Sequence, residues 1–547
     1  MISDIDMDYV SEMLYDWRSV LPASILSEAE LINKEEQDRY DSSESFAVGF
    51  YLRSLNLTAK YPIITIPGVI STGLESWYVD DQPNACATKA NFRQRLWGSW
   101  SMIKAMFMDK QCWLNQICLD PETGMDPPGA KLRAAQGFEA SDFFITGYWI
   151  WNKLLENLAA LHYDPNNMFS AAYDWRLAYS DIEKRDHYFT RMKTVIEHNL
   201  KFTGEKTILV SHSMGSQIAF YFMKWVEAEG YGNGGKRWVN DHIEAFVDIS
   251  GCLLGTPKSI VALMSGEMRD TVQLNPLAVY GLEKFFSRSE RAYMLRTFGG
   301  IPSMIPKGGS VVWGGIDSAP DDAPGQNNTF GKFIAFEKTI GELSSKNLTV
   351  EGAMETLFKV SPEWFKKRVL ENYSWGLATT TKQLKANEKD PSKWTNPLEV
   401  ALPYAPDMKL YHFYGIGKPT ERSYWYEEID NKTMFNLDLT IDKHRADSVL
   451  LGEGDGTISL LTHSICHIWK RPNSIYNPGG SKVTIVEMKH EPDLFDMRGG
   501  AKTAEHVDIL GRGELNEMVI RVAAGKGDEI PDRIISNIEQ YVEKMGI

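Results

Sequence analysis

A serine placed between a strand-like and a helix-like segment is the clearest sign of chemistry in this sequence. Ser213 lies in Ser211-His-Ser-Met-Gly215, after the β-branched run 207–210 and before a segment whose apolar residues recur at helical spacing. A strand, a sharp turn and a helix form the context of a nucleophile elbow, which lifts a serine hydroxyl above a sheet edge. Gly215 keeps one small position of that motif, whereas Ser211 replaces the other glycine. The alternative role for Ser213 is to cap the helix.

A nucleophilic serine requires a base, and in this type of fold the acid and then the histidine follow it along the chain. His506 is the favoured base. It lies in a loop after the last strong strand pattern, at 482–488, and a side chain there can return to the serine. His490, which ends that strand pattern, is the competing candidate.

Asp455 is the favoured acid and lies in Gly452-Glu-Gly-Asp-Gly-Thr457. The glycines allow a short carboxylate loop to approach a histidine closely. Asp248, at the end of the apolar run 245–249, is the alternative acid. The oxyanion hole needs two backbone N–H donors. We assign them to Met214, directly after the nucleophile, and to Ile70, in the loop after the first strand pattern.

A metal site is a weaker possibility. His463 and His467 are four residues apart and flank Cys466, but two ligands at helical spacing and one thiol are a weak signal. A capping or core role is favoured for these residues. The sequence therefore predicts chemistry without a metal and without a cofactor.

The elements that position these residues follow from hydrophobic patterns. Apolar, β-branched runs predict buried strands at 61–66, 207–210, 245–249, 409–414 and 482–488. Helical patterns separate them, which implies an α/β fold with a mainly parallel sheet and crossover helices. Residues 255–400 lack such runs and are predicted to form a helical and loop cap over the sheet. The predicted organisation is a helical or juxtamembrane segment at 1–50, a core at 51–254 and 401–547, and the cap at 255–400.

Cys86 and Cys112 bracket a basic, aromatic segment. Its apolar residues share one helical stripe and alternate with Arg93, Arg95 and Lys104; the aromatic members are Phe92, Trp97, Trp100 and Phe107. Such a segment suits a lipid surface, and packing on the sheet is the alternative. A disulfide across this loop of about 25 residues would stabilise it by roughly 3–4 kcal/mol. We therefore predict that 86–130 is a lid or membrane-binding insertion.

Composition narrows the class of protein. The 547 residues are 43% apolar and 24% charged, as in ordinary globular proteins. There are 73 acidic and 58 basic residues, and the formal net charge of −15 gives no general electrostatic reason to bind nucleic acid. The sequence contains no run of 18 apolar residues, and its acidic N-terminus does not resemble a secretory signal.

Two features bear on the compartment. Five cysteines are an odd number, so at least one thiol is free or pairs between chains. Candidate glycosylation sequons begin at Asn56, Asn327, Asn347, Asn372 and Asn431. Composition by itself leaves open both a cytosolic protein with buried thiols and a lumenal domain.

Taken together, these motifs resemble the lecithin–cholesterol acyltransferase family over most of residues 55–540. The resemblance rests on Pro67-Gly-Val-Ile70, the cysteine-bracketed segment followed by Trp113, Tyr173-Asp-Trp-Arg-Leu177, Ser211 to Gly215, Tyr414-Gly-Ile-Gly417, Pro419-Thr-Glu-Arg422, Gly454-Asp-Gly-Thr457 and Arg498 to Leu510. Serine at position 211 is typical of the diacylglycerol-using branch, whereas the sterol-using branch keeps glycine there.

The resemblance implies an α/β-hydrolase fold with a disulfide-stapled lid that carries Trp97 as its lid tryptophan. It implies Ser213, Asp455 and His506 as the catalytic triad, with Ile70 and Met214 as oxyanion donors. The implied reaction moves the sn-2 acyl group of a phospholipid to diacylglycerol at a membrane or lipid-droplet surface, through a Ser213 acyl-enzyme. Hydrolysis of a lipase or phospholipase A type and transfer to a sterol are alternatives. The intact triad disfavours a lipid-binding protein without activity.

The resemblance also implies a lumenal catalytic domain on the endoplasmic reticulum, anchored by an N-terminal membrane helix. This chain lacks such a helix, and we expect that it has been truncated. The family often has a second disulfide, but His412 stands in the strand where the first of its cysteines is expected, which leaves Cys466 without that partner.

Overall fold

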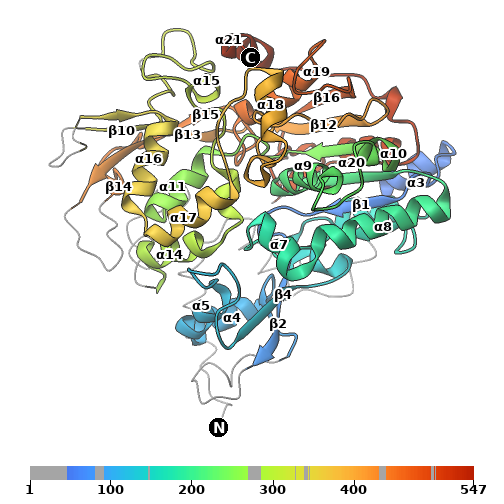
Figure 1. The fold of residues 1–547 in the computed structure, drawn as a ribbon, viewed down its shortest axis with the longest axis horizontal. Coiled ribbons are helices and arrows are strands. Elements are labelled where there is room, and N and C mark those ends of the chain that lie inside the picture. Colours follow the sequence, from blue (N-terminus) through green and yellow to red (C-terminus); the bar gives the residue numbers. More distant parts are fainter. Residues whose placement is uncertain are drawn as a thin grey trace.

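The centre of the molecule is a six-stranded sheet in which every strand pairing is parallel (Figure 1). The computed structural model describes residues 46–79, 92–145, 148–268, 285–326, 328–337, 343, 345–429, 439–493, 498 and 500–547. The strands run in the spatial order β16 (Lys482–Lys489), β12 (Lys409–Ile416), β9 (Ile243–Ile249), β8 (Thr207–His212), β1 (Ile63–Ile66) and β7 (Met168–Ser170). The predicted α/β fold with a mainly parallel sheet is thereby confirmed.

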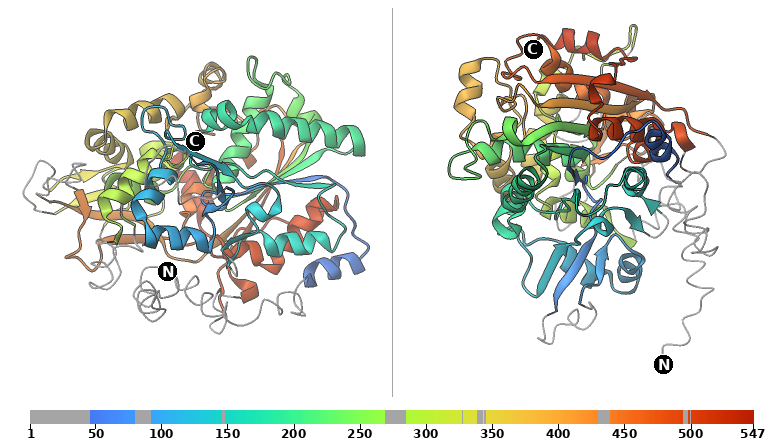
Figure 2. Two further views of the ribbon diagram at one scale, coloured as in Figure 1. Left: turned by 90° about the horizontal axis from the view of Figure 1, so that it is seen from below. Right: turned by 90° about the vertical axis from the view of Figure 1, so that its right-hand side faces the viewer.

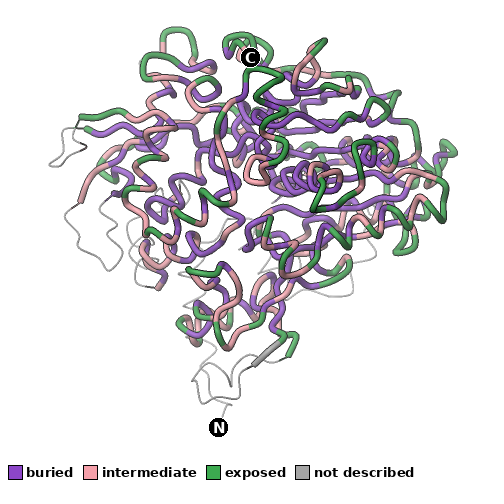
Figure 3. The backbone as a smooth tube through the Cα atoms, viewed as in Figure 1, coloured by how far each residue is buried: buried purple, intermediate pink, exposed green. Residues whose placement is uncertain are grey.

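Five of these strands coincide with the predicted runs. Their apolar residues are continuous because both faces of the sheet are covered, so neighbouring side chains enter opposite cores. In β8, Leu209 belongs to one core cluster, while Ile208 and Val210 belong to the other. Figure 3 shows the strands as buried. The sixth strand, β7, has three residues, too few for its sequence pattern to reveal it.

Helices cover both faces of the sheet. The first cluster receives apolar side chains from α8 (Tyr188–Thr203), α9 (Met214–Glu227), α19 (Ser464–Lys470) and α21 (Ile538–Met545). The second receives them from α3 (Ala47–Ser54), α6 (Asn152–Ala159) and α20 (Gly513–Ala523). Described residues from both ends of the chain thus contribute to the cores on the two faces of the sheet.

A second, smaller sheet joins the predicted cap to the C-terminal part of the core. Within residues 255–400, the main helices are α11 (Pro257–Ser265), α14 (Arg288–Thr297), α15 (Gly309–Trp313), α16 (Val350–Val360), α17 (Glu363–Asn372) and α18 (Thr381–Asn387). The same range holds two short strands that sequence patterns did not reveal, β10 (Ile334–Phe336) and β11 (Asn347–Leu348). They share a sheet with β13 (Thr420–Glu428), β14 (Leu439–Ile441) and β15 (Val449–Gly452), at the left of Figure 1.

The predicted lid projects from one end of the molecule (Figures 1 and 2). Within the predicted bounds of 86–130 lie β3 (Arg95–Trp97) and the helices α4 (Trp100–Met108) and α5 (Lys110–Ile117). The strand β3 shares a sheet with β2 (Leu74–Val79) and β4 (Ala130–Ala134), which fall mainly outside those bounds. The single helical stripe expected across this segment is wrong. Residues 95–97 pair as a strand with β2, and Gly98, at φ +78°, turns the chain before α4 begins.

Among the described residues, none of the helices combines the length and the apolar character needed to cross a bilayer.

Candidate active site

Ser213 occupies a sharp turn between β8 and α9. Its φ of 58° and ψ of −125° are rare for a residue with a side chain, and such strain is characteristic of functional turns. Its N–H donates to the carbonyl of Ile249, 3.1 Å away, which ties the turn to the end of β9. A Cβ atom on Gly215 would lie 2.3 Å from the carbonyl oxygen of Ile66, so the elbow requires glycine at that position.

Ser211 fits at the elbow because its hydroxyl is buried and hydrogen-bonded. Its Oγ lies 2.8 Å from the Oγ of Ser216 and 3.3 Å from the carbonyl oxygen of Val247. Ser216 in turn donates to Asp248 at 2.6 Å. A serine in place of the usual glycine therefore adds a hydrogen-bonded connection near Ser213 rather than an unsatisfied polar group.

Ser213, His506 and Asp455 form a hydrogen-bonded relay. The Nε2 atom of His506 lies 2.9 Å from Ser213 Oγ, and its Nδ1 atom lies 2.7 Å from Asp455 Oδ2. All three side chains are buried. This order of groups is what a serine nucleophile, its general base and the orienting acid require.

Asp455 is held ionised by its surroundings. Complete burial opposes its charge, but the His506 imidazole and the backbone N–H groups of Ile458 and Thr457 outweigh burial and lower the pKa of the carboxyl group. A Cβ atom on Gly454 would lie 2.2 Å from the carbonyl oxygen of Ile458. The glycine before Asp455 thus allows the tight loop that the sequence pattern suggested.

The two sequence alternatives have other partners. Asp248 lies 2.8 Å from Nδ1 of His412 and accepts from Ser216. His490 accepts a hydrogen bond from the N–H of Ala504 through Nδ1 at 3.1 Å.

The two histidines of the weak metal signal also have side-chain partners. His463 contacts His412 at 3.0 Å, and His467 contacts the Tyr414 hydroxyl at 3.1 Å. These residues support the structure around the relay.

His212 was not singled out from the sequence, although it is directly before the nucleophile. Its Nε2 atom lies 2.7 Å from the carbonyl oxygen of His506, so the proton on Nε2 must donate to that carbonyl. Burial, with His506 next in effect, lowers the pKa of His212 to about 3, and the ring stays neutral at physiological pH. His212 therefore holds the main chain of His506 in place.

We expect His212→Phe to lower kcat by about tenfold or more, because it leaves the buried His506 carbonyl unsatisfied, at a cost of roughly 1–3 kcal/mol. His212→Gln, whose amide can donate at a similar place, is the matched control and should recover part of the rate. Steady-state kinetics with circular dichroism checks the prediction. An unchanged kcat in a folded His212→Phe variant would remove His212 from the positioning of the base.

The two expected oxyanion donors, Met214 and Ile70, have different surroundings. Met214 is fully buried at the first position of α9, where the helix N-terminus favours negative charge. Ile70 has a φ of 59° and is 45% exposed. Its carbonyl accepts a hydrogen bond of 2.9 Å from the indole N–H of Trp97. Trp97 thereby links β3 to the loop that carries Ile70.

We expect Trp97→Phe to lower kcat by up to about 100-fold. The variant loses the hydrogen bond to the Ile70 carbonyl, so the Ile70 N–H would shift and stabilise the oxyanion less well. Binding to vesicles should change little, since the ring can still pack against Trp175, whose centroid is 5.1 Å away. Separate measurements of kcat and of vesicle partitioning check the prediction. Equal losses in both would mean that Trp97 serves mainly the lipid surface.

The other predicted lid residues do not form one lipid-facing set. Phe92 is 67% exposed and packs edge-on against Trp77 at a centroid distance of 5.3 Å. Phe107 packs against Phe285 at 5.0 Å, and Trp100 is partly buried at the start of α4. The exposed aromatic surface therefore lies at Phe92 and Trp77 rather than along α4.

The cysteines and sequons are only partly described. Cys118, Cys252 and Cys466 are buried free thiols, whereas Cys86 lies outside the described residues, and its pairing with Cys112 stays a prediction. Asn327 and Asn431 also lie outside the described residues. Asn56 and Asn347 are exposed, while Asn372 is half-buried and hydrogen-bonds to Ser180 and to the carbonyl of Arg368.

Comparisons with known proteins agree with this geometry. The family model described as lecithin:cholesterol acyltransferase matches residues 91–513. The phospholipid:diacylglycerol acyltransferase of Saccharomyces cerevisiae is 54% identical, with 99% of this chain and 82% of that protein covered. The enzyme of the same name from Schizosaccharomyces pombe is 49% identical, with 98% and 84% covered, and phospholipid:diacylglycerol acyltransferase 1 of Arabidopsis thaliana is 32% identical, with 91% and 86% covered. The chain therefore belongs to the lecithin:cholesterol acyltransferase family.

Proposed function

We propose that this protein is a phospholipid:diacylglycerol acyltransferase. It moves an acyl group from the sn-2 position of a phospholipid to diacylglycerol and yields triacylglycerol and a lysophospholipid. The preassembled relay of Ser213, His506 and Asp455 carries the proposal, in a chain whose relatives at 54% and 49% identity bear that name.

In the first half-reaction, His506 accepts the proton of Ser213 through Nε2, and Ser213 Oγ attacks the ester carbonyl. The backbone N–H groups of Ile70 and Met214 would stabilise the oxyanion, and each such donor contributes about 3–4 kcal/mol in a serine hydrolase. Protonated His506 then returns its proton to the departing lysophospholipid oxygen. The acyl group remains as an ester of Ser213.

In the second half-reaction, the diacylglycerol hydroxyl takes the place of the lysophospholipid. His506 accepts its proton as the oxygen attacks the acyl-enzyme, and Ser213 is released with that proton. Asp455 holds the imidazole in the tautomer with its proton on Nδ1 and stabilises the imidazolium in both halves. The same groups could pass the acyl chain to water, so exclusion of water from the site must favour transfer.

The organisation around the relay is part of the proposal. The core would comprise 51–254 and 401–547, with the cap at 255–400 and a lid at 86–130 that a Cys86–Cys112 disulfide staples. The other three cysteines, Cys118, Cys252 and Cys466, are buried free thiols, which supports that pairing. Phe92 in the lid and Trp77 in β2 form an exposed aromatic pair, which supports docking of this end of the molecule on a membrane or lipid-droplet surface.

A lumenal location at the endoplasmic reticulum is proposed on two grounds. A stapling disulfide persists in an oxidising compartment, and the sequons at Asn56 and Asn347 are exposed, as modification requires. Glycosidase treatment of the protein purified from its own cells should shift its mass. An unshifted mass together with two free thiols at Cys86 and Cys112 would contradict this location.

Vesicles of phosphatidylcholine, labelled in the sn-2 acyl chain, and diacylglycerol test the reaction. The label should appear in triacylglycerol, with lysophospholipid formed in equal amount. Label in free fatty acid without triacylglycerol would overturn the transferase assignment in favour of a phospholipase. Label in neither product would overturn both assignments.

A further inference from the structure

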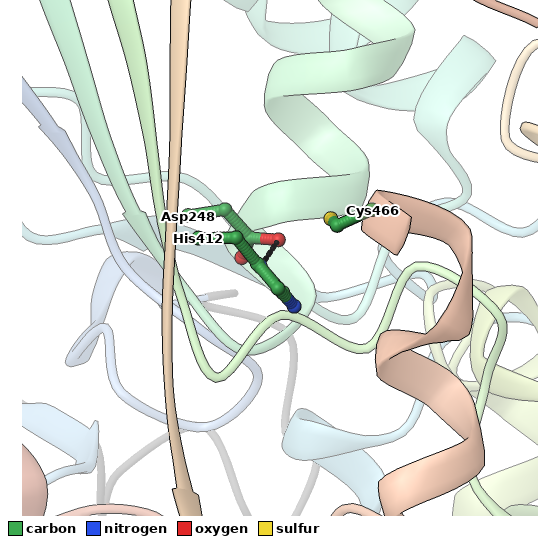
Figure 4. Close-up of side chains that lie close together, drawn as sticks. All are labelled: Asp248, His412 and Cys466. Atoms are coloured by element: carbon green, nitrogen blue, oxygen red, sulfur yellow. Dashed lines mark ion pairs between the residues drawn. The ribbon is translucent and has the colours of Figure 1, made fainter. Parts of the chain in front are cut away.

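A second cluster of chemically active side chains lies below the nucleophile and takes no part in the relay. Within the described residues, Asp248, His412 and Cys466 each offer one ligand atom, and these atoms lie within 4.8 Å of one another. Figure 4 shows the three side chains converging from β9, β12 and α19. All three are buried, with 1–2% of each residue exposed.

The fold brings these residues together from distant parts of the chain. Asp248 and His412 are direct neighbours in the parallel register of β9 and β12. Cys466 enters from α19, the helix that follows the loop of Asp455. Since Cys466 is a free thiol, it contributes a sulfur that can ionise.

The inner and outer atoms of the cluster differ in their partners. On the outside, Asp248 Oδ1 accepts from the Ser216 hydroxyl at 2.6 Å, and His412 Nε2 lies 3.0 Å from His463 Nδ1. On the inside, Asp248 Oδ2 and His412 Nδ1 are 2.8 Å apart, yet neither has a partner with hydrogen-bond geometry. In metal sites, a histidine typically binds the ion through one ring nitrogen and forms a hydrogen bond through the other. A carboxylate typically divides its two oxygens in the same way.

We propose that Asp248, His412 and Cys466 bind one zinc ion. Zinc accepts oxygen, nitrogen and sulfur ligands together, with bond lengths of about 2.0–2.3 Å, and a water molecule would complete its usual four ligands. A carboxylate and a thiolate balance the charge of Zn²⁺, so the complex carries no net charge in a buried site. The thiolate is the form of cysteine that binds zinc, so the Cys466 thiol would release its proton as the ion binds.

The proposed role of the ion is structural, since Ser213 and His506 interact with each other and not with these three residues. The ion would connect the end of β9 and the middle of β12 to α19, the helix that follows the loop of Asp455 in the chain. Through Asp248 and Ser216 it would also reach the start of α9. A bound ion should therefore raise the midpoint of thermal unfolding.

The test uses the full chain carrying a purification tag without histidines. After saturation with zinc and removal of the excess, elemental analysis should find one zinc per chain. Replacement by Co²⁺ should give a thiolate-to-cobalt charge-transfer band. Cys466→Ala should lose the band and bind zinc at least about tenfold more weakly, whereas Cys118→Ala, which removes another buried free thiol, should keep both.

Two results would overturn the proposal. The first is a wild-type chain that binds no zinc and gives no cobalt band. The second is equal binding by wild type and Cys466→Ala. Should Cys466→Ala fail to fold, zinc X-ray absorption on the wild-type chain still decides the question, because a first shell without sulfur excludes Cys466 as a ligand. These measurements do not depend on the acyl-transfer reaction, so either proposal can fail without the other.

Discussion

Ser213→Ala should reduce acyl transfer by about 10⁶-fold, to below detection, because loss of the nucleophile removes the covalent step that the relay serves. The variant should fold normally, since Ser213 is held through its backbone N–H and not through its side chain alone. The measurement is the appearance of labelled triacylglycerol in vesicles, together with sedimentation of the variant with those vesicles. Vesicle binding should be unchanged.

Ser211→Ala is the matched control for that experiment. It removes a buried hydroxyl two residues away that contacts Ser216 and the Val247 carbonyl but not His506. We expect it to keep activity within about tenfold, as the loss of one neutral hydrogen bond costs roughly 1 kcal/mol. Measurable triacylglycerol from Ser213→Ala, or loss of its vesicle binding, would contradict the assignment of Ser213 as nucleophile.

Asp455→Asn should lower kcat by about 10⁴-fold, the size of this change in a serine protease triad. The asparagine amide can donate to Nδ1 of His506, which places the imidazole proton on Nε2. That tautomer cannot accept the proton of Ser213, even though the geometry is nearly unchanged. Steady-state transfer rates across pH, with circular dichroism to confirm folding, test this expectation.

Asp248→Asn discriminates between the two acids that the sequence offered. Asp248 lies beside His412 and Ser216, so we expect this variant to retain transfer within about tenfold. If Asp248→Asn abolished acyl transfer and Asp455→Asn retained it, Asp248 rather than Asp455 would be the acid of the triad.

The lowered pKa of Asp455 also sets the direction of its pH effect on stability. A carboxyl group whose pKa is lower in the folded than in the unfolded state stabilises the fold fully above the unfolded value, near 3.8. That contribution declines as pH falls through the lower folded value. His212 acts in the same direction over a wider range, because the unfolded ring takes up a proton below about pH 6.5 and the folded ring only near 3.

Local sequence patterns were sufficient for the central sheet and the relay. Continuous apolar runs mark strands covered on both faces, and five of the six parallel strands could be located from them. The elbow around Ser213 and the glycine-flanked loop of Asp455 are also local, because tight turns restrict which residues can stand beside the reactive one. The order of acid and histidine along the chain then singled out His506.

Contacts between distant residues were decided by the tertiary structure. His212 lies 294 positions from the carbonyl that it supports, and nothing in its neighbourhood marks that contact. The sequence suggested a weak metal signal at His463, Cys466 and His467, whereas strand register and the position of α19 place Cys466 beside Asp248 and His412 instead. The prediction of a single helical stripe in the lid was wrong, because residues 95–97 pair with β2 as a strand despite their helical periodicity. The sequence by itself determined the candidate reactive groups and the strands that carry them, since those depend on short-range sterics and burial. Their supporting partners depend on how strands align and helices pack, and these are properties of the folded chain as a whole.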